Sequence, residues 1–248
     1  MREVLAFIAQ KQAEFAQLPL FKFMQDRSIS PKQRLAFAPC AAPFILAFAD
    51  LNKYVLRQEP TEDKIRAILN QHSYEDDYHW QWFLEDIDKL GFNSELKLND
   101  SLRFIWSEET KHSRLLAYEL YRYLTIQTEP LSQLVILESM EATSSVFSSF
   151  AVQIAEELQT ITNQEFCYFG HCHIDVENGH HAHTDEVKQF ISNIQLKDEV
   201  LTQQFELVEK VFELFSEWSY GMLAYAQAYQ KAQLYDLDRD EKSVLAIA

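Results

Sequence analysis

The stretch of sequence that decides the fold is PLSQLVILESMEATSSVFSSFAVQIAEELQT, which runs from Pro130 to Thr160. Proline suits its first helical position, and apolar residues occupy nearly every face of the helix that it predicts. Such a helix has to be buried among other elements. Those elements are not expected to be β-strands, because hairpin turns favour glycine and the chain holds only four glycines, Gly91, Gly170, Gly179 and Gly221. The sequence therefore predicts an all-α protein.

The rest of the chain fits a single domain, residues 1–248, of about seven or eight helices. Ser30 and Pro31 make a good N-cap and first helical residue for an apolar run in which Pro39 and Pro43 should kink or restart the helix. No internal boundary is convincing, because the polar connectors are short. The other expected helices cover Arg2–Gln17, Phe21–Gln25, Leu35–Leu56, Thr61–Gly91, Leu102–Trp106, Thr110–Thr125 and Lys197–Gln233.

Composition and charge narrow the class of protein. The 248 residues are 47% hydrophobic, which is enough for a sizeable core, and their formal net charge of −16 opposes binding to nucleic acid or to anionic membranes. No signal peptide or long apolar run occurs. The three cysteines, Cys40, Cys167 and Cys172, are few and odd in number, so we expect buried thiols in a reducing, cytoplasmic compartment.

Two short segments far apart in the chain repeat the pattern His-x3-acid-x2-His. The first is HSYEDDYH, from His72 to His79, and the second is HIDVENGH, from His173 to His180. At about 100° per residue, positions i, i+4 and i+7 fall on one face of a helix. Each segment would therefore direct two imidazoles and a carboxylate the same way. Imidazoles and carboxylates together suit a redox-active first-row metal, chiefly iron, better than magnesium or calcium.

The long helix from Pro130 supplies a further carboxylate. Glu138 and Glu141 interrupt its apolar surface, and a carboxylate inside such a helix is costly unless it is paired, hydrogen-bonded or bound to metal. Carboxylate-bridged di-metal bundles combine glutamates with acid-x-x-His pairs, a spacing that recurs at Asp76–His79 and Glu177–His180. Glu141 is the candidate bridging carboxylate. The alternative places Glu138 at the solvent edge and pairs Glu141 with a buried Arg or Tyr.

These motifs resemble the heme-oxygenase-like diiron oxidases, a superfamily that shares a seven-helix fold with thiaminase II and pyrroloquinoline-quinone synthase. The resemblance covers the chain from about Leu35 to the last helix, and its most specific element is His173-x3-Glu177-x2-His180. It implies a heme-oxygenase-like fold, two Fe(2+) ions per chain, and a ligand set made of His79, Glu141, His173, Glu177 and His180.

The chain departs from that family's pattern at two positions. Glu177 stands where Asp is common, and His72 stands where some members have a glutamate. The acid of the first segment is therefore either Glu75 or Asp76, and His72 is a replacement ligand. If neither acid reaches the metal, the site holds one ion rather than two.

Neighbouring side chains could support the ligands or shape a pocket. His171 and Asp175 could orient ligands, although His171 falls on the opposite helix face from His173. Tyr74 and Tyr78, together with Trp80 and Trp82, bracket the first segment and either line a substrate pocket, carry an electron or pack in the core.

The resemblance implies an oxidoreductase that uses dioxygen, an external reductant and a small organic substrate such as an amino acid or a fatty acid. A homodimer is an open alternative to a monomer. Phe37, Phe44, Ile45 and Phe48 would form an apolar pocket wall, and Arg34, Lys53 or Arg57 would hold a substrate carboxylate. The competing hypothesis is a metal-free hydrolase like thiaminase II, with a cysteine nucleophile, or a small-molecule-binding protein of the same fold.

Overall fold

Helices form all the regular secondary structure in residues 1–93, 97–179 and 184–245, which are the residues that the computed structural model describes. In chain order they are α1 (Arg2–Phe15), α2 (Pro19–Gln25), α3 (Pro31–Arg34), α4 (Ala38–Leu51), the π-helical turn η1 (Asn52–Leu56), α5 (Lys64–Asp76), α6 (His79–Lys89), α7 (Leu98–Ile105), α8 (Lys111–Ile126), α9 (Pro130–Thr162), α10 (His171–Gly179), α11 (Asp185–Asn193) and α12 (Asp198–Leu245). The all-α prediction is confirmed, with more helices than expected.

Helix α9 is the centre of the fold. It begins at Pro130 as predicted and contacts α1, α2, α3, α5 and α12. Its buried side chains, among them Leu134, Ile136 and Ile154, belong to one hydrophobic core that extends through most of the helices. The helix ends at Asn163, whose φ of 55° is the left-handed conformation that often terminates helices.

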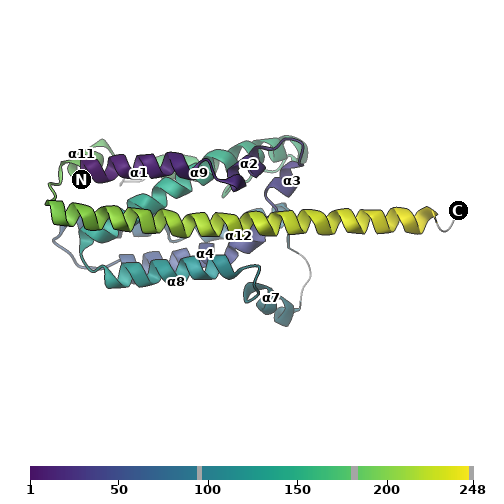
Figure 1. The fold of residues 1–248 in the computed structure, drawn as a ribbon, viewed down its shortest axis with the longest axis horizontal. Helices are drawn as coiled ribbons and strands as arrows, with labels where there is room; N and C mark the ends of the chain where they lie inside the picture. The colour runs from purple at the N-terminus through teal and green to yellow at the C-terminus, as the bar shows by residue number, and fades with distance from the viewer. Residues whose placement is uncertain (94–96, 180–183, 246–248) are drawn as a thin grey trace.

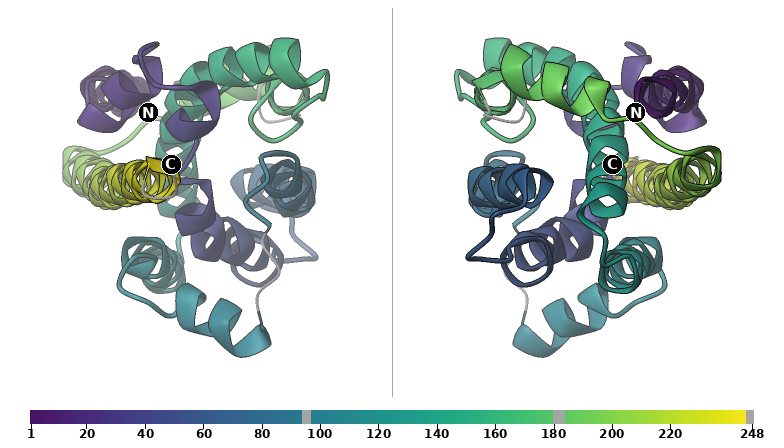
Figure 2. Two further views of the ribbon diagram at one scale, coloured as in Figure 1. Left: turned by 90° about the vertical axis from the view of Figure 1, so that its right-hand side faces the viewer. Right: turned by 90° about the vertical axis from the view of Figure 1, so that its left-hand side faces the viewer.

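Helix α12 runs the length of the molecule and beyond the other helices at its C-terminal end (Figure 1). Seen along its axis, α1 and α12 lie on one side of α4 and α9, and α5 and α6 lie on the other (Figure 2). The helix is longer than predicted, because it continues past Gln233 to Leu245. None of the helices in the described part of the chain combines the length and apolar character that a membrane crossing requires.

The prolines of the apolar run act only in part as predicted. Ser30 caps α3 through its side chain, which accepts a hydrogen bond from the Gln33 N–H. The helix then stops and restarts at Ala38, with Pro39 in its first turn and Pro43 inside it. The predicted helix therefore begins at Ala38 and not at Leu35, whereas Pro43 lies inside α4 without ending it.

The helix predicted over Thr61–Gly91 is wrong in one respect that matters for the site, because it is broken between Asp76 and His79. The cause is Arg57, the residue that follows η1. The Arg57 guanidinium donates to the Ser73 carbonyl at 2.7 Å, to the Ser73 hydroxyl at 3.0 Å and to the Asp77 carboxylate at 2.7 Å. This arginine binds a carbonyl in the last turn of α5 and fixes Asp77 beside it, so the chain turns before α6 begins.

Candidate metal centre

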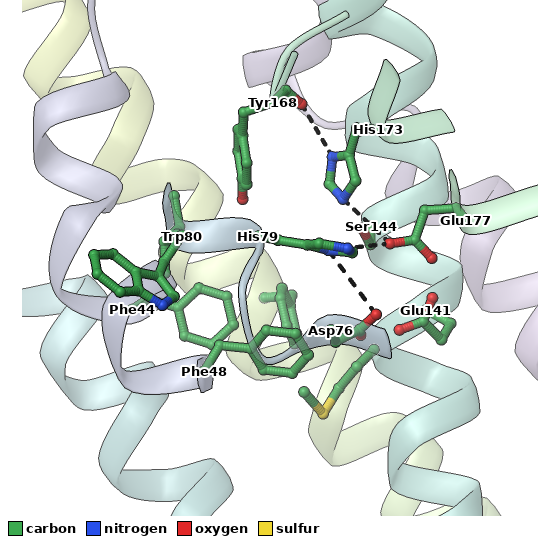
Figure 3. A pocket seen from close by; sticks show the side chains of 13 residues that line it. Phe44, Phe48, Asp76, His79, Trp80, Glu141, Ser144, Tyr168, His173 and Glu177 are labelled. Atoms are coloured by element: carbon green, nitrogen blue, oxygen red, sulfur yellow. Dashed lines mark hydrogen bonds and ion pairs between the residues drawn. The ribbon is translucent and has the colours of Figure 1, made fainter. Parts of the chain in front are cut away.

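The two histidine segments and the middle of α9 meet in the core. Helix α5 contributes His72 and Asp76, α9 contributes Glu141, and α10 contributes His173 and Glu177. His79 is the first residue of α6. Figure 3 shows all of these side chains except His72 around one pocket, with the carboxylates and imidazoles directed toward each other. Three regions that are distant in the sequence, α5–α6, α9 and α10, therefore present nitrogen and oxygen donors to one small volume.

The donors form two groups of three. In the first group, donor atoms of His72, Asp76 and Glu141 all lie within 4.8 Å of one another. The second group consists of His79, His173 and Glu177, with donor atoms equally close. Each group combines imidazole nitrogen with carboxylate oxygen, which is the donor set that suits iron and other first-row metals.

The first group places two carboxyl groups and an imidazole close together in a buried place. The Nε2 of His72 lies 2.8 Å from Asp76 Oδ2 and 3.4 Å from Glu141 Oε1. Burial opposes charge on the imidazole, but the carboxylates outweigh it and raise the pKa of His72 to about 10. Burial, reinforced by the neighbouring carboxylates and opposed by His72, raises the pKa of Glu141 well above its usual value. A bound cation would take the place of the protons that these shifts favour.

The second group is oriented by the backbone. The Nε2 of His173 lies 3.2 Å from Glu177 Oε1, and His79 Nδ1 lies 3.5 Å from the same oxygen. The other ring nitrogen of His173, Nδ1, is hydrogen-bonded to the Tyr168 carbonyl at 3.0 Å. A carbonyl partner makes Nδ1 the protonated nitrogen and leaves Nε2 with a lone pair for a metal, as in most histidine ligands.

Asp76 stands between the two groups. Its Oδ2 faces His72, and its Oδ1 lies 3.9 Å from His79 Nδ1. The side chain is only 2% exposed. Asp76 is therefore a second candidate, beside Glu141, for a carboxylate shared by two ions.

Asp86, a buried carboxylate on α6, holds the loop that orients the second group. Asp86 accepts hydrogen bonds from the N–H groups of Cys167 and Phe169, both at 3.1 Å, and from Lys89 at 3.2 Å. Burial raises the pKa of Asp86 above its usual value, although these donors oppose the shift. Asp86 therefore fixes the loop whose Tyr168 carbonyl orients His173.

The same loop contains a disulfide, which corrects our expectation of buried thiols. Cys167 and Cys172 are bonded to each other across the segment that leads into α10. Cys40 is free and buried, as expected. The close spacing of the pair was a signal in the sequence, but it was too common a pattern to decide between thiols and a disulfide.

The second group opens onto a mostly apolar cavity, drawn in Figure 3. Phe44, Ile45, Phe48, Trp80, Met140, Ser144, Tyr168 and Phe215 line this metal-side cavity together with the candidate ligands other than His72. A second, inner cavity shares five of these residues and continues to Phe15, Phe37, Ala41, Thr143, Phe147, Phe169, Trp218 and Ser219. The prediction that Phe37, Phe44, Ile45 and Phe48 form an apolar wall is confirmed.

A groove reaches the carboxylates from the other side of α9. It is lined by apolar residues of α1, by Gln12, by the serines Ser144, Ser145, Ser148 and Ser149, and by Lys188. Glu138, Glu141 and Glu177 lie along it. Burial raises the pKa of Glu138. Glu138 thus borders the centre from the groove and belongs to neither group of donors.

Other predicted residues belong to neither group of three. Glu75 accepts a hydrogen bond from Gln71 on its own helix, whereas Asp76 is a member of the first group. His171 is exposed and paired with Glu156 at 2.7 Å. Asp175 is also exposed. His180 lies outside the described residues.

The two tyrosines have different places. Tyr74 is 47% exposed, donates to Glu59 and packs under the Arg57 guanidinium, so it does not line the pocket. The Tyr78 ring contacts those of His79 and Trp82 at centroid distances of 5.0 and 5.1 Å. It therefore supports His79 from outside the cavity.

The predicted carboxylate holders do not face the cavities. The buried Arg34 pairs with Glu157, and Arg57 is occupied by Ser73 and Asp77. Among the described residues, neither a lysine nor an arginine lines the two inner cavities. This prediction was wrong, because both arginines satisfy local carboxylates and carbonyls and Lys53, in η1, lines neither cavity.

Sequence reasoning missed Tyr168, Ser144 and Asp86. Tyr168 and Ser144 line both inner cavities, and Asp86 is linked to a loop 81 residues further along the chain. The closeness of Tyr168 to His173 was the only local signal. Asp86 had none, because its partners are backbone groups.

No protein-family model matches the chain, and no curated protein matches it at a significant level. The function therefore has to be inferred from the two donor groups and the cavities beside them.

Proposed function

We propose that this protein is a dioxygen-activating non-heme diiron oxidoreductase that acts on a small organic substrate. The observation that carries the proposal is the pair of three-residue donor groups, with Asp76 between them, at the end of an apolar cavity. Iron(II) held there would supply the electrons and the open coordination positions that dioxygen requires. A heme-oxygenase-like fold is part of the same proposal.

The side chains have separable roles in this proposal. His72 and Glu141 would hold one ion and His79, His173 and Glu177 the other. The Tyr168 carbonyl keeps His173 in the required tautomer. The aromatic cavity wall would exclude water from the substrate and so limit side reactions.

The competing hydrolase hypothesis requires a reactive cysteine thiolate. Cys40 is buried, donates to the Glu109 carbonyl and has a pKa raised by burial to about 12. Cys167 and Cys172 are bonded to each other. Neither arrangement favours a nucleophile at neutral pH.

Metal analysis of protein purified from iron-supplemented cells tests the proposal. We expect about two irons per chain in the wild type and about one in each of His72→Ala and His173→Ala, because each variant removes a donor from a different group. The control is His171→Ala, which changes an exposed histidine close to the centre and should leave both irons bound. Full iron content in both test variants would contradict the ligand assignment.

Oxygen uptake separates a redox centre from a structural metal. An oxygen electrode should record consumption when the loaded wild type is mixed with an external reductant, and less by either test variant. A loaded wild type that consumes no more oxygen than His72→Ala would exclude the proposed activity.

A further inference from the structure

Tyr168 lies where the two inner cavities meet. Its ring stacks against the His173 imidazole, with centroids 5.0 Å apart and an interplanar angle of 29°. It also forms an edge contact with Phe83 at 5.3 Å. Figure 3 shows the hydroxyl at the end of the ring pointing into the pocket, toward His79. The side chain is thus held against one candidate ligand and directed toward another.

The contacts that fix Tyr168 do not use its hydroxyl. Its carbonyl is bonded to His173, and the amides on either side of it donate to Asp86. No residue in the described part of the chain forms a hydrogen bond with the hydroxyl. Tyr168 is half-buried and lines both cavities, so its hydroxyl can take a partner from the cavity instead of from the protein. A bound molecule in the cavity would provide that partner.

The side chains around the hydroxyl indicate which kind of molecule would bind there. In the inner cavity, the hydroxyls of Thr143 and Ser219 already donate to carbonyls of their own helices, Ser144 adds a further hydroxyl beside Tyr168, and the remaining wall is mostly aromatic. No lysine or arginine of the described chain lines either cavity, so neither of these cations would pair there with an anionic group of a ligand. A neutral molecule with an apolar body fits this wall better than an anion.

We propose that the Tyr168 hydroxyl donates a hydrogen bond to a neutral acceptor group of the substrate, such as a carbonyl, and so positions its apolar body in the inner cavity. That this molecule is a substrate rests on the proposed function, whereas its hydrogen bond with Tyr168 does not. Tyr168 would act as a specificity-determining residue that selects an uncharged acceptor in front of the metal donors.

Two small aromatic probes of the same shape test this assignment in metal-free protein. Acetophenone carries a carbonyl where α-methylstyrene carries a methylene. Titrations followed by ligand-observed NMR should show that Tyr168→Phe weakens acetophenone binding by about 3- to 10-fold, the value of one neutral hydrogen bond, and leaves α-methylstyrene unchanged. The matched control is Tyr118→Phe, which alters an exposed tyrosine and should change neither affinity.

A benzoate titration tests the preference for a neutral group, and we expect benzoate to bind the metal-free wild type more weakly than acetophenone. The proposal is overturned if acetophenone does not bind, if Tyr168→Phe weakens both neutral probes equally or neither, or if benzoate binds more tightly. A general packing defect would move both neutral probes together. Because metal is absent from this experiment, its outcome is independent of the iron content that tests the proposed function.

Discussion

Replacing Asp86 tests the support of the metal centre without changing any candidate ligand. The side chain is fully buried and accepts two backbone N–H groups at 3.1 Å. Asp86→Asn keeps the size of the side chain but has one acceptor oxygen in place of two, so one buried N–H loses its partner. An unsatisfied buried donor costs about 1–3 kcal/mol.

The charge of the carboxylate decides where in that range the effect falls. Because burial raises the pKa of Asp86, the ionised carboxylate is itself unfavourable in the folded protein, and its removal offsets part of the loss. We therefore expect Asp86→Asn to lower the free energy of unfolding by about 1–2 kcal/mol, and Asp86→Ala by more, since alanine removes both acceptors and leaves a cavity.

Thermal denaturation of the metal-free variants measures this effect. For a chain of this length, about 1–2 kcal/mol corresponds to a fall in Tm of roughly 2–8 °C. Asp88→Asn is the matched control, because Asp88 is an exposed acid on the same helix. Cobalt(II) titration should also show weaker binding by Asp86→Asn, since the loop that orients His173 is loosened. A variant as stable as Asp88→Asn would refute this account of the loop.

Three further predictions follow from the site and its surroundings. The metal-free protein should lose thermal stability as the pH rises from 6.5 to about 10. The folded pKa of His72 is raised, so the stability that its protonated imidazole contributes is lost through that range, and the raised pKa of Glu141 acts in the same direction. Gly179→Ala should increase amide protection of α10 in hydrogen exchange, since nothing lies within 4 Å of an added Cβ. Gly170→Ala should instead destabilise the protein, because its Cβ would meet the Phe166 carbonyl oxygen at 2.1 Å. Thiol titration of denatured, unreduced protein should find one thiol, that of Cys40, and three would contradict the disulfide.

The helices and the aromatic cavity wall could be predicted from the sequence because their signals are local. Pro130 and the apolar run after it define α9, and Ser30 followed by Pro31 defines the start of α3. The spacing of His173 and Glu177 on one face of a helix likewise placed them in contact. In each case, residues within a few turns of one another determine the result.

The parts that could not be predicted depend on contacts between distant residues. The break before His79 depends on Arg57, which lies 16 residues before the carbonyl that it binds. The orientation of the Tyr168 loop depends on Asp86, on another helix. Hydrophobic periodicity carries no information about such polar contacts, since a buried arginine or carboxylate reads in sequence as an interruption of an apolar face.

The seven-residue spacing of His72 and His79 does not suit two ligands of a single metal ion. Seven residues in a continuous helix span about 10.5 Å along its axis, so His72 and His79 could hardly have bound one ion together. The structure assigns them to different donor groups and places Asp76, between them in sequence, between the groups in space. Beyond the break at Asp77, His79 lies 3.5 Å from Glu177 of α10. The spacing of the segment and the point at which its helix stops both support the two-ion centre that we propose.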